Sequence, residues 1–254
     1  MSAEVSWKED GLASVTLAWP DRRNALGPDE VLELAAALRE VSTARCVVLR
    51  AQGKAFCAGG DLDAIATVAR SGREAVRDAI YTAYHAAARA LWSLRGVSIA
   101  AVDGGAVGLG ADLALLCNVR FVGARGWLDQ GWARLGLVPG TGGAWLVESI
   151  AGKGTAWDFI TSSGTRWDGP MLERRGLAVA VDGSAEDAAW ERAQRVARWP
   201  EETVRAYVSL LRPTAEGYAE HLERCLEHQA SLLAGDAFLE LAERALGRGT
   251  AKAN

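Results

Sequence analysis

The sequence lacks the features that mark metal-binding, secreted and membrane-spanning proteins. Its four cysteines do not have the spacing of metal ligands, and three of them stand in apolar runs, so we expect reduced, buried thiols. The N-terminus has no apolar segment typical of a secretory signal. Every apolar stretch is interrupted by charge or glycine before it reaches about 18 residues, which predicts no membrane span. We therefore expect a cytoplasmic protein.

The chain has no excess of basic residues and lacks three common glycine motifs. Lys and Arg number 28 against 32 Asp and Glu, so the net charge is −4 and no nucleic-acid partner is expected. The segments that begin at Gly108 and Gly140 lack the last glycine of a dinucleotide-binding fingerprint. The Gly152-Lys153 turn lacks the first glycine of a P-loop, and there is no Gly-x-Ser-x-Gly elbow. These absences argue against a Rossmann cofactor site and a serine hydrolase.

The hydrophobic pattern that is present predicts a mixed α/β chain. A length of 254 residues that are 50% hydrophobic can bury one large core, or a core with a helical appendage. Periodicity predicts strands at residues 13–18, 98–102 and 119–122, and helices at residues 29–41, 73–94, 143–151, 154–161, 186–199, 201–211, 218–233 and 237–246. Because the end of the chain is almost wholly helical, we expect a core at residues 1–197 and a helical region at residues 198–254.

Two glycine-rich segments, residues 53–62 and 103–113, carry the strongest chemical signal. Each follows an apolar, β-branched run and leads into a helical pattern. A strand that breaks at glycine before a helix leaves unpaired backbone N–H groups pointing one way. Two such sites brought together could hold one oxygen that gains negative charge, as acyl transfer, enolate formation and thioester chemistry require. Glycine-rich turns between strands and helices are mostly structural, so neither segment is decisive alone.

Four segments in order resemble the enoyl-CoA hydratase/isomerase (crotonase) superfamily, and the resemblance covers nearly the whole chain. Residues 20–26 resemble its first CoA-contacting turn, residues 55–62 and 104–117 its two oxyanion segments, and residues 135–143 its Leu-Gly-x-x-Pro-Gly-x-Gly-Gly stretch. The resemblance implies a crotonase fold, a spiral of ββα units with two roughly perpendicular sheets. It also implies an acyl-CoA thioester substrate, with no metal, flavin or nicotinamide cofactor beyond the coenzyme A that the substrate carries.

The resemblance further implies a homotrimer, or a hexamer built as a dimer of trimers. The helical tail of such proteins builds the trimer contacts and helps to close the neighbouring active site. The tail of this chain holds more apolar residues than an isolated helical arm should expose. These residues are Tyr218, Leu222, Leu226, Leu232, Leu233, Phe238 and Leu241.

By resemblance, the two oxyanion donors are the backbone N–H groups of Gly60 and Leu109. Most relatives carry glycine at the second position, and leucine must avoid the positive φ that glycine tolerates. A backbone donor nevertheless survives any side chain that its φ and ψ allow. Residues 110–117 are predicted to form a buried helix whose N-terminal dipole faces the developing charge.

The same resemblance assigns contacts with coenzyme A. The residues expected to contact it are Asn24, Ala25, Leu26, Ala58, Asp61 and Leu62. Arg22 and Arg23 are candidate phosphate partners because a guanidinium matches phosphate geometry, although a solvated turn would carry the same residues.

The acid and base residues depart from the hydratase pattern. Hydration of an enoyl thioester needs one water activated and one proton delivered, for which hydratases use two glutamates. The first glutamate position aligns with Asp112, which keeps a carboxylate but could instead brace its own helix. The second aligns with Trp132, and a third acidic site of some isomerases and dehalogenases aligns with Gly140. One carboxylate of three remains, which argues against two-glutamate hydration.

Two residues have spacings similar to the aromatic acyl pocket of chlorobenzoyl-CoA dehalogenases. Trp132 stands 23 residues after Leu109 and His85 stands 24 before it. Packing alone would explain Trp132, and a buried, hydrogen-bonded helix residue would explain His85. Asp129 is a further acid, for which solvation at the surface is the simpler interpretation.

We therefore predict an acyl-CoA enzyme that stabilises a thioester enolate in a backbone oxyanion hole. The predicted catalytic set is Gly60, Leu109, Asp112, Trp132 and His85, and isomerase or other single-carboxylate chemistry is favoured over hydration. Two alternatives stay open: a dehalogenase-like hydrolase acting on aryl-CoA, and a catalytically silent acyl-CoA-binding paralogue.

Overall fold

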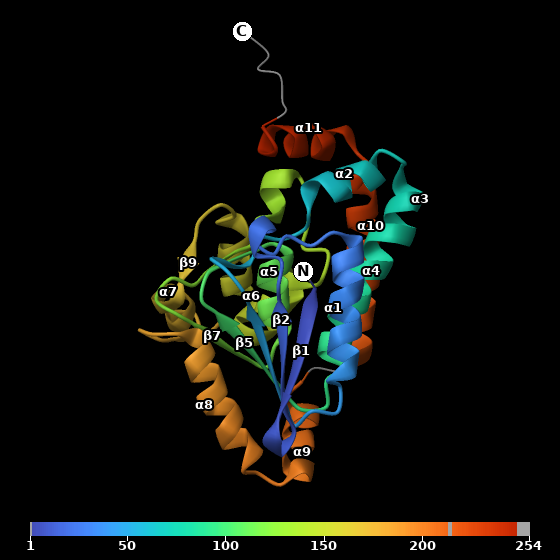
Figure 1. The fold of residues 1–254 in the computed structure, drawn as a ribbon. Coiled ribbons are helices and arrows are strands. Elements are labelled where there is room, and N and C mark those ends of the chain that lie inside the picture. The colour runs from blue at the N-terminus through green and yellow to red at the C-terminus, as the bar shows by residue number, and fades with distance from the viewer. Residues whose placement is uncertain (1, 213–214, 248–254) are drawn as a thin grey trace.

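A six-stranded sheet and a four-stranded sheet form the centre of the computed structural model, which describes residues 2–212 and 215–247. The larger sheet consists, in spatial order, of β1 (Ala3–Lys8), β2 (Leu12–Leu17), β3 (Cys46–Ala51), β5 (Val97–Val102), β7 (Val119–Val122) and β10 (Val179–Ala180). The smaller sheet consists of β4 (Ala55–Cys57), β6 (Gly105–Val107), β8 (Trp127–Asp129) and β9 (Trp167–Asp168). Figure 1 shows the larger sheet with helices on both sides.

The strands of the two sheets alternate along the chain. β3, β5 and β7 each lie in the larger sheet, and each is followed by a strand of the smaller sheet, β4, β6 or β8. A helix then follows: α2 (Leu62–Ala69) after β4, α5 (Leu109–Leu116) after β6, and α6 (Gly143–Thr161) after β8 by way of a short 3₁₀ helix, η4 (Trp132–Leu135). This recurrence is the ββα spiral, so the predicted mixed α/β fold with two sheets is confirmed.

The larger sheet separates two apolar clusters. Val47 and Leu49 of β3 point into the main core with α1 (Pro28–Glu40), whereas Cys46 and Val48 point into a second cluster under α8 (Ala185–Ala197). Side chains alternate between the two faces of a strand, so a central strand covered on both faces must be apolar throughout. The uninterrupted apolar run before the first glycine-rich segment has this cause.

The long helix predicted at residues 73–94 has three parts. These are α3 (Arg73–Ala75), a π-helical stretch labelled η3 (Val76–Tyr81) and α4 (Thr82–Trp92). A π-helical stretch shifts the helix face by a fraction of a turn and is common at functional sites. The pair of helices predicted on either side of Gly152 is also found, because α6 is broken at that residue (φ 84°, ψ 164°).

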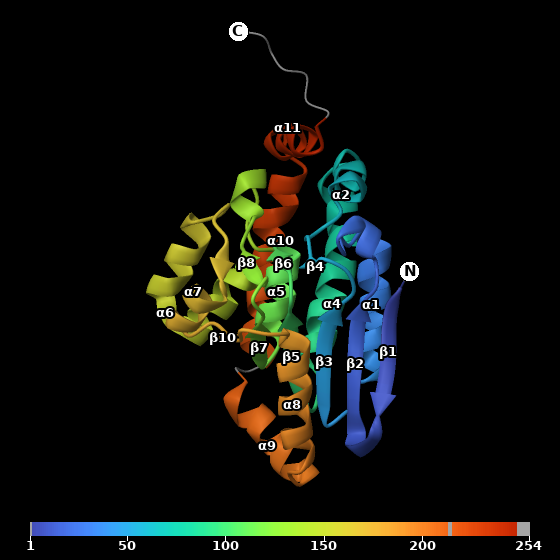
Figure 2. The ribbon, with the colours of Figure 1, turned by 60° about the vertical axis from the view of Figure 1, so that its left-hand side comes forward.

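The C-terminal helices follow the main body and then return to it. α8 and α9 (Glu201–Leu211) lie along the lower part of the molecule in Figure 1, and α10 (Ala215–Leu233) and α11 (Asp236–Ala245) lead back to the top. α11 packs against α2 and η4 of the same chain, as Figure 2 shows from a second side. The remaining short elements are η1 (Glu9–Gly11), η2 (Pro20–Arg22) and α7 (Gly169–Arg174).

The apolar residues of the tail are used partly within their own chain. Tyr218, Leu222 and Phe238 are buried in the main core. The helices α10 and α11 cover the top of this chain's own spiral, because α10 runs back along η3, which brings its apolar face onto the same molecule. The expected contacts with a neighbouring chain stay a prediction. Among the described residues, no helix combines the length and apolarity needed to cross a membrane.

Candidate active site

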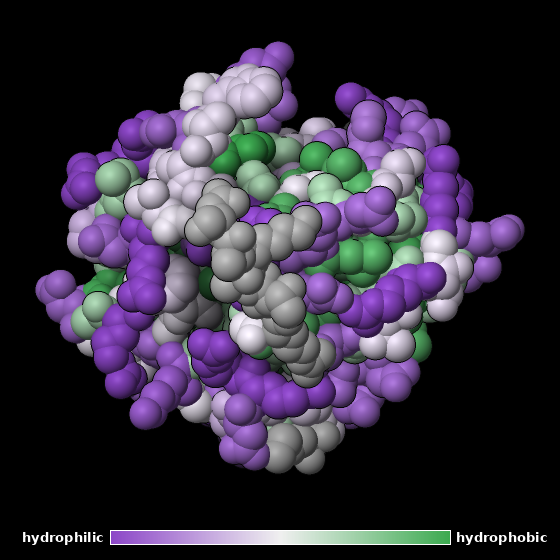
Figure 3. All heavy atoms as spheres, turned by 90° about the horizontal axis from the view of Figure 1, so that it is seen from above, coloured by the Kyte–Doolittle hydropathy of each residue, from purple (hydrophilic) through white to green (hydrophobic). Residues whose placement is uncertain are grey.

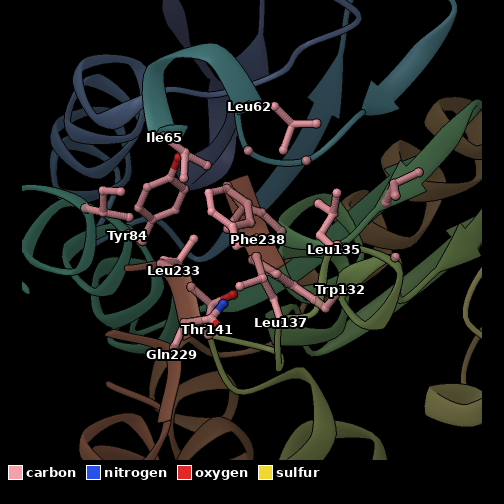
Figure 4. A pocket seen from close by; sticks show the side chains of 18 of the residues that line it. Leu62, Ile65, Tyr84, Trp132, Leu135, Leu137, Thr141, Gln229, Leu233 and Phe238 are labelled. Carbon is pink, nitrogen blue, oxygen red and sulfur yellow. The ribbon is translucent and has the colours of Figure 1, made fainter. Parts of the chain in front are cut away.

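A cavity of about 400 Å³ lies beyond the ends of β4 and β6, under α11. Figure 4 shows its walls: Leu62 and Ile65 come from α2, Tyr84 from α4, and Leu233 and Phe238 from α10 and α11. Viewed from above, Figure 3 shows apolar side chains between hydrophilic ones on the face that carries these helices. Of the described residues that line the cavity, Arg134 alone is charged, so the cavity suits an uncharged apolar chain.

The two glycine-rich segments meet at this cavity because their strands are neighbours. β4 and β6 pair in parallel, with Ala55 opposite Gly105 and Cys57 opposite Ala106. Chains leaving two adjacent parallel strands emerge at the same edge of the sheet. Gly60 and Leu109 both line the cavity, and neither backbone N–H has an acceptor among the described residues. The predicted oxyanion donors are therefore brought together and left free.

Leu109 takes an ordinary helical backbone because the turn is made one residue earlier. Gly108 has φ 53° and ψ −113°, a conformation closed to residues with a Cβ. Leu109 itself is not among the described non-glycine residues with positive φ, which are Asp10, Arg23 and Asn24. The N–H of Leu109 belongs to the first turn of α5, where no intrahelical carbonyl accepts it. Leucine at this position is thus compatible with a donor role.

The N-terminus of α5 sits directly on the end of β4. A Cβ added to Gly110 would lie 2.3 Å from the carbonyl oxygen of Cys57, so only glycine allows this approach. Every residue of α5 is buried. The partial positive charge at its N-terminus therefore acts in a dry environment, where it stabilises an anion more strongly than in water.

Asp112 is fully buried and stands behind the cavity wall. Thr141 Oγ1 donates to its Oδ2 at 2.6 Å and Gln130 Nε2 donates to its Oδ1 at 3.0 Å. Burial raises the pKa of Asp112 to about 7, although these hydrogen bonds and the backbone N–H groups of Thr141 and Gly143 lower it. Thr141 lines the cavity and Asp112 does not, so the hydroxyl of Thr141 is the link between the two.

Trp132 lies in the cavity wall, beside the start of α5. Its indole Nε1 would be 3.7 Å from a Cβ on Gly108, and this buried N–H has no hydrogen-bond partner among the described residues. An indole N–H is a donor only. Trp132 thus places an uncharged donor beside the start of α5.

His85 lies outside this cavity. It lines a separate hollow with Arg39, Arg77 and Arg89, and its Nε2 donates to the carbonyl oxygen of Gly140 at 3.0 Å. Burial lowers the pKa of His85 to about 4, so the ring is neutral at pH 7. The structure does not bring His85 to the other predicted catalytic residues, because Gly140 and Tyr81 stand between it and the cavity.

Asp129 is not solvated, contrary to expectation. It is buried, accepts from the N–H groups of Gly131 and Gly164 at 2.9 Å each, and pairs with Arg134 at 2.8 Å. These bonds use both oxygens of the carboxylate to hold the loop that carries Trp132. Asp129 therefore has a structural role.

The predicted CoA-contacting segments are joined to one another. Ala58 N–H donates to Arg23 O, Leu26 N–H to Gly59 O, and Asp61 N–H to Leu26 O, each at 2.9–3.0 Å. The Tyr84 hydroxyl also donates to Leu26 O at 2.7 Å, so both backbone polar groups of Leu26 are engaged inside the protein.

The turn that precedes these bonds is fixed by the side chain of Asn24. Its amide accepts from Trp19 N–H and donates to the carbonyl oxygens of Gln52 and Ala55. Ala25 follows it in the turn, and its carbonyl oxygen accepts from Arg22. Arg22 also pairs with Glu30 at 2.7 Å and with Asp61 at 3.4 Å, whereas Arg23 is exposed without an ion pair in the described chain.

Comparison with known proteins agrees with this geometry. The model of the enoyl-CoA hydratase/isomerase family matches residues 7–236. The chain belongs to that family. It is 34% identical over 216 residues to a probable enoyl-CoA hydratase of Mycobacterium tuberculosis, covering 84% of this chain and 82% of the relative. It is 29% identical over 201 residues to 1,2-epoxyphenylacetyl-CoA isomerase of Escherichia coli, covering 77% of this chain and 76% of that enzyme.

Solved structures of other proteins have the same fold. An enoyl-CoA hydratase/isomerase from Mycobacterium paratuberculosis superposes with a TM-score of 0.88 at 23% identity, over 96% of this chain and 98% of the other. Pseudomonas aeruginosa OdaA superposes with a TM-score of 0.85 at 25% identity, over 97% and 99%. The family membership and the fold predicted from the sequence are therefore confirmed.

Sequence reasoning missed several polar residues of the cavity, among them Thr141, Tyr81 and Gln229. All three line it, and Thr141 lies beside Gln229 in Figure 4. A signal for Gln229 was present in the sequence: with Leu222, Leu226 and Leu233 it follows the helical spacing of the buried face of α10. A polar residue on a buried helix face calls for a partner.

Proposed function

We propose that this member of the family stabilises the enolate of an acyl-CoA thioester, and that it catalyses isomerisation or another reaction needing a single carboxylate. The observation that carries the proposal is the pair of free N–H groups, Gly60 and Leu109, at the end of an apolar cavity. A thioester oxygen accepting from both would gain the stabilisation that proton removal from the α carbon needs.

Asp112 would take the proton from the α carbon of the substrate, and return it, through the hydroxyl of Thr141. A carboxyl with a pKa near 7 is present in both protonation states at neutral pH, which suits a group that takes a proton and returns it. Thr141 can pass a proton because its hydroxyl is both donor and acceptor. The substrate would meet the Thr141 hydroxyl, and Asp112 would set its protonation.

The residues of the cavity wall support a reaction other than two-glutamate hydration. No carboxylate of the described residues lines the cavity, and Trp132 lines it at the position that the resemblance aligns with the second hydratase glutamate. The Escherichia coli relative is named an isomerase, which supports isomerisation, although the relative from Mycobacterium tuberculosis is named a probable hydratase. The separation of His85 from the cavity weakens the dehalogenase-like alternative, and the complete burial of Asp112 keeps a silent acyl-CoA-binding protein as the second candidate.

We expect the protein to bind acyl-CoA thioesters at micromolar to millimolar concentration. Calorimetry with acetyl-, crotonyl-, hexanoyl- and benzoyl-CoA measures binding, and mass spectrometry of the same mixtures detects a product. Binding with an isomerised product supports the enzyme. Binding without turnover of any thioester identifies the silent candidate, and no affinity for any thioester or for free CoA at millimolar concentration contradicts the proposal.

The protein is also expected to form a trimer or a dimer of trimers. α9 exposes Tyr207, Leu210 and Leu211, and both leucines are 79% exposed, which is unusual for neighbouring large apolar residues. Light scattering at micromolar concentration should give three or six chain masses, and Leu211→Glu should lower that mass. A monomeric wild-type protein would contradict this expectation.

A further inference from the structure

Two polar groups meet at one wall of the acyl cavity without partners. A Cβ added to Gly140 would lie 2.8 Å from Tyr81 Oη and 3.1 Å from Gln229 Nε2, so both atoms face the same point of the loop. Gly140, Tyr81 and Gln229 all line the cavity. Tyr81 comes from the π-helical η3 and Gln229 from α10, so the fold assembles the pair from distant parts of the chain.

The orientation of the Gln229 amide is fixed, and its NH₂ group is the end that makes no hydrogen bond. The side chain is 1% exposed, and its Oε1 accepts from the N–H of Val138 at 3.2 Å. A backbone N–H needs an acceptor, which excludes the flipped amide. Nε2 is buried and donates to nothing among the described residues. A buried amide donor in this state is costly unless a ligand satisfies it.

The hydroxyl of Tyr81 is also without a partner. It makes no hydrogen bond within the described residues, whereas the hydroxyl of Tyr84, in the same cavity, donates to Leu26 O at 2.7 Å. Burial is the main cause that raises the pKa of Tyr81 well above 10, so the phenol keeps its proton and remains a donor.

We propose that Tyr81 Oη and Gln229 Nε2 form a donor pair that binds an uncharged oxygen on the acyl chain, such as a keto or hydroxyl oxygen beyond the thioester. The inference rests on the acyl-CoA function proposed above and names its substrate class. A purely apolar chain would cover both donors and leave them unpaired, and sites built to hydrogen-bond a substrate discriminate strongly against analogues that lack the group.

The surroundings favour a neutral oxygen over a carboxylate. Arg134, the charged side chain of the lining, already pairs with Asp129, so no free cation of the described lining would balance a second buried negative charge. The donors also occupy the space beside Gly140, so neutral groups face this part of the cavity.

The test compares hexanoyl-CoA with 3-, 4- and 5-oxohexanoyl-CoA, which have the same chain length and place one keto oxygen at successive positions. Calorimetry on the wild-type protein should give at least one oxo compound with about tenfold tighter binding than hexanoyl-CoA, as expected for two neutral hydrogen bonds. Tyr81→Phe and Gln229→Met should each reduce that ratio by about threefold or more. Tyr207→Phe is the matched control, because Tyr207 lies outside the cavity and is 51% exposed, and it should leave the ratio unchanged.

The outcomes separate this inference from the function on which it rests. If hexanoyl-CoA binds and no oxo compound binds more tightly, the donor pair is not an acyl subsite although the acyl-CoA function stands. The same conclusion follows if the preference survives both Tyr81→Phe and Gln229→Met. If none of the four thioesters binds, the proposed function and the subsite both fail. Folding of each variant is checked by thermal unfolding, and Tyr81→Phe removes only a hydroxyl that no described residue contacts.

Discussion

Turnover of the true substrate should fall by about 10²–10⁴-fold in Asp112→Asn, the usual contribution of a positioned proton-transfer group. This corresponds to about 3–5 kcal/mol of transition-state stabilisation. Binding of the CoA thioester should be nearly unchanged, because the side chain is fully buried behind Thr141 and the oxyanion donors are backbone groups. Steady-state kinetics and calorimetry measure the two effects separately.

The role of Thr141 and the pH profile distinguish a proton relay from a brace. Thr141→Val keeps the shape of the side chain and removes the hydroxyl, so it should lose nearly as much turnover as Asp112→Asn, and Thr141→Ser should recover most of it.

If Asp112 is the base that removes the α proton, kcat of the wild-type enzyme should rise as the pH passes about 7, where the carboxyl loses its own proton. This rise of kcat near pH 7 should be absent in Asp112→Asn. Full activity in Asp112→Asn would make Asp112 a structural residue and leave catalysis to the oxyanion hole.

Leu109→Pro should lower kcat by about 10²–10³-fold, the usual cost of removing one donor from an oxyanion hole. Leu109 is the first residue of α5, a position where proline is tolerated because its missing N–H has no intrahelical acceptor. The preceding Gly108 has a non-helical ψ of −113°, which avoids the helical backbone that proline disfavours in its predecessor. The substitution therefore removes the donor and leaves the helix in place.

Leu109→Ala is the matched control for this experiment. It removes the buried side chain but keeps the N–H, so it should lose stability, by about 2–5 kcal/mol for a buried leucine, while kcat falls much less than in Leu109→Pro. Chemical denaturation and kcat are measured on both variants. Equal losses of kcat in the two would show that the side chain matters and that the N–H of Leu109 is not an oxyanion donor.

The fold was predictable because its determinants are local or repeated. The apolar run of β3, the glycines after β4 and β6 and the helical pattern of α5 are each readable within about ten residues. The order of these segments then implied the spiral, which the comparisons with the family confirmed. The meeting of Gly60 and Leu109 followed from the same pattern, since parallel strands that are neighbours release their chains at one edge.

The surroundings of the acids were not predictable, because burial depends on segments far apart in the sequence. Asp112 is held by Gln130 and Thr141, and Asp129 by Gly164 and Arg134, none of which a local pattern connects to them. His85 has the spacing of a pocket residue, yet its ring turns to Gly140 on the outer side of the wall. Spacing along a helix does not determine which cavity a side chain enters when neighbouring segments pack on both sides.

The sequence by itself determined the family, the two sheets and the meeting of Gly60 and Leu109 at one edge, since glycine placement and strand order act through the backbone and tolerate varied side chains. The tertiary structure alone decided which polar groups line the cavity. The return of α10 and α11 over the same chain brings Gln229 beside Tyr81 and Gly140, about 90 residues or more from either in sequence. Such a contact depends on how the helices pack, because the free energy that holds α10 in place comes from the burial of its whole apolar face and not from Gln229.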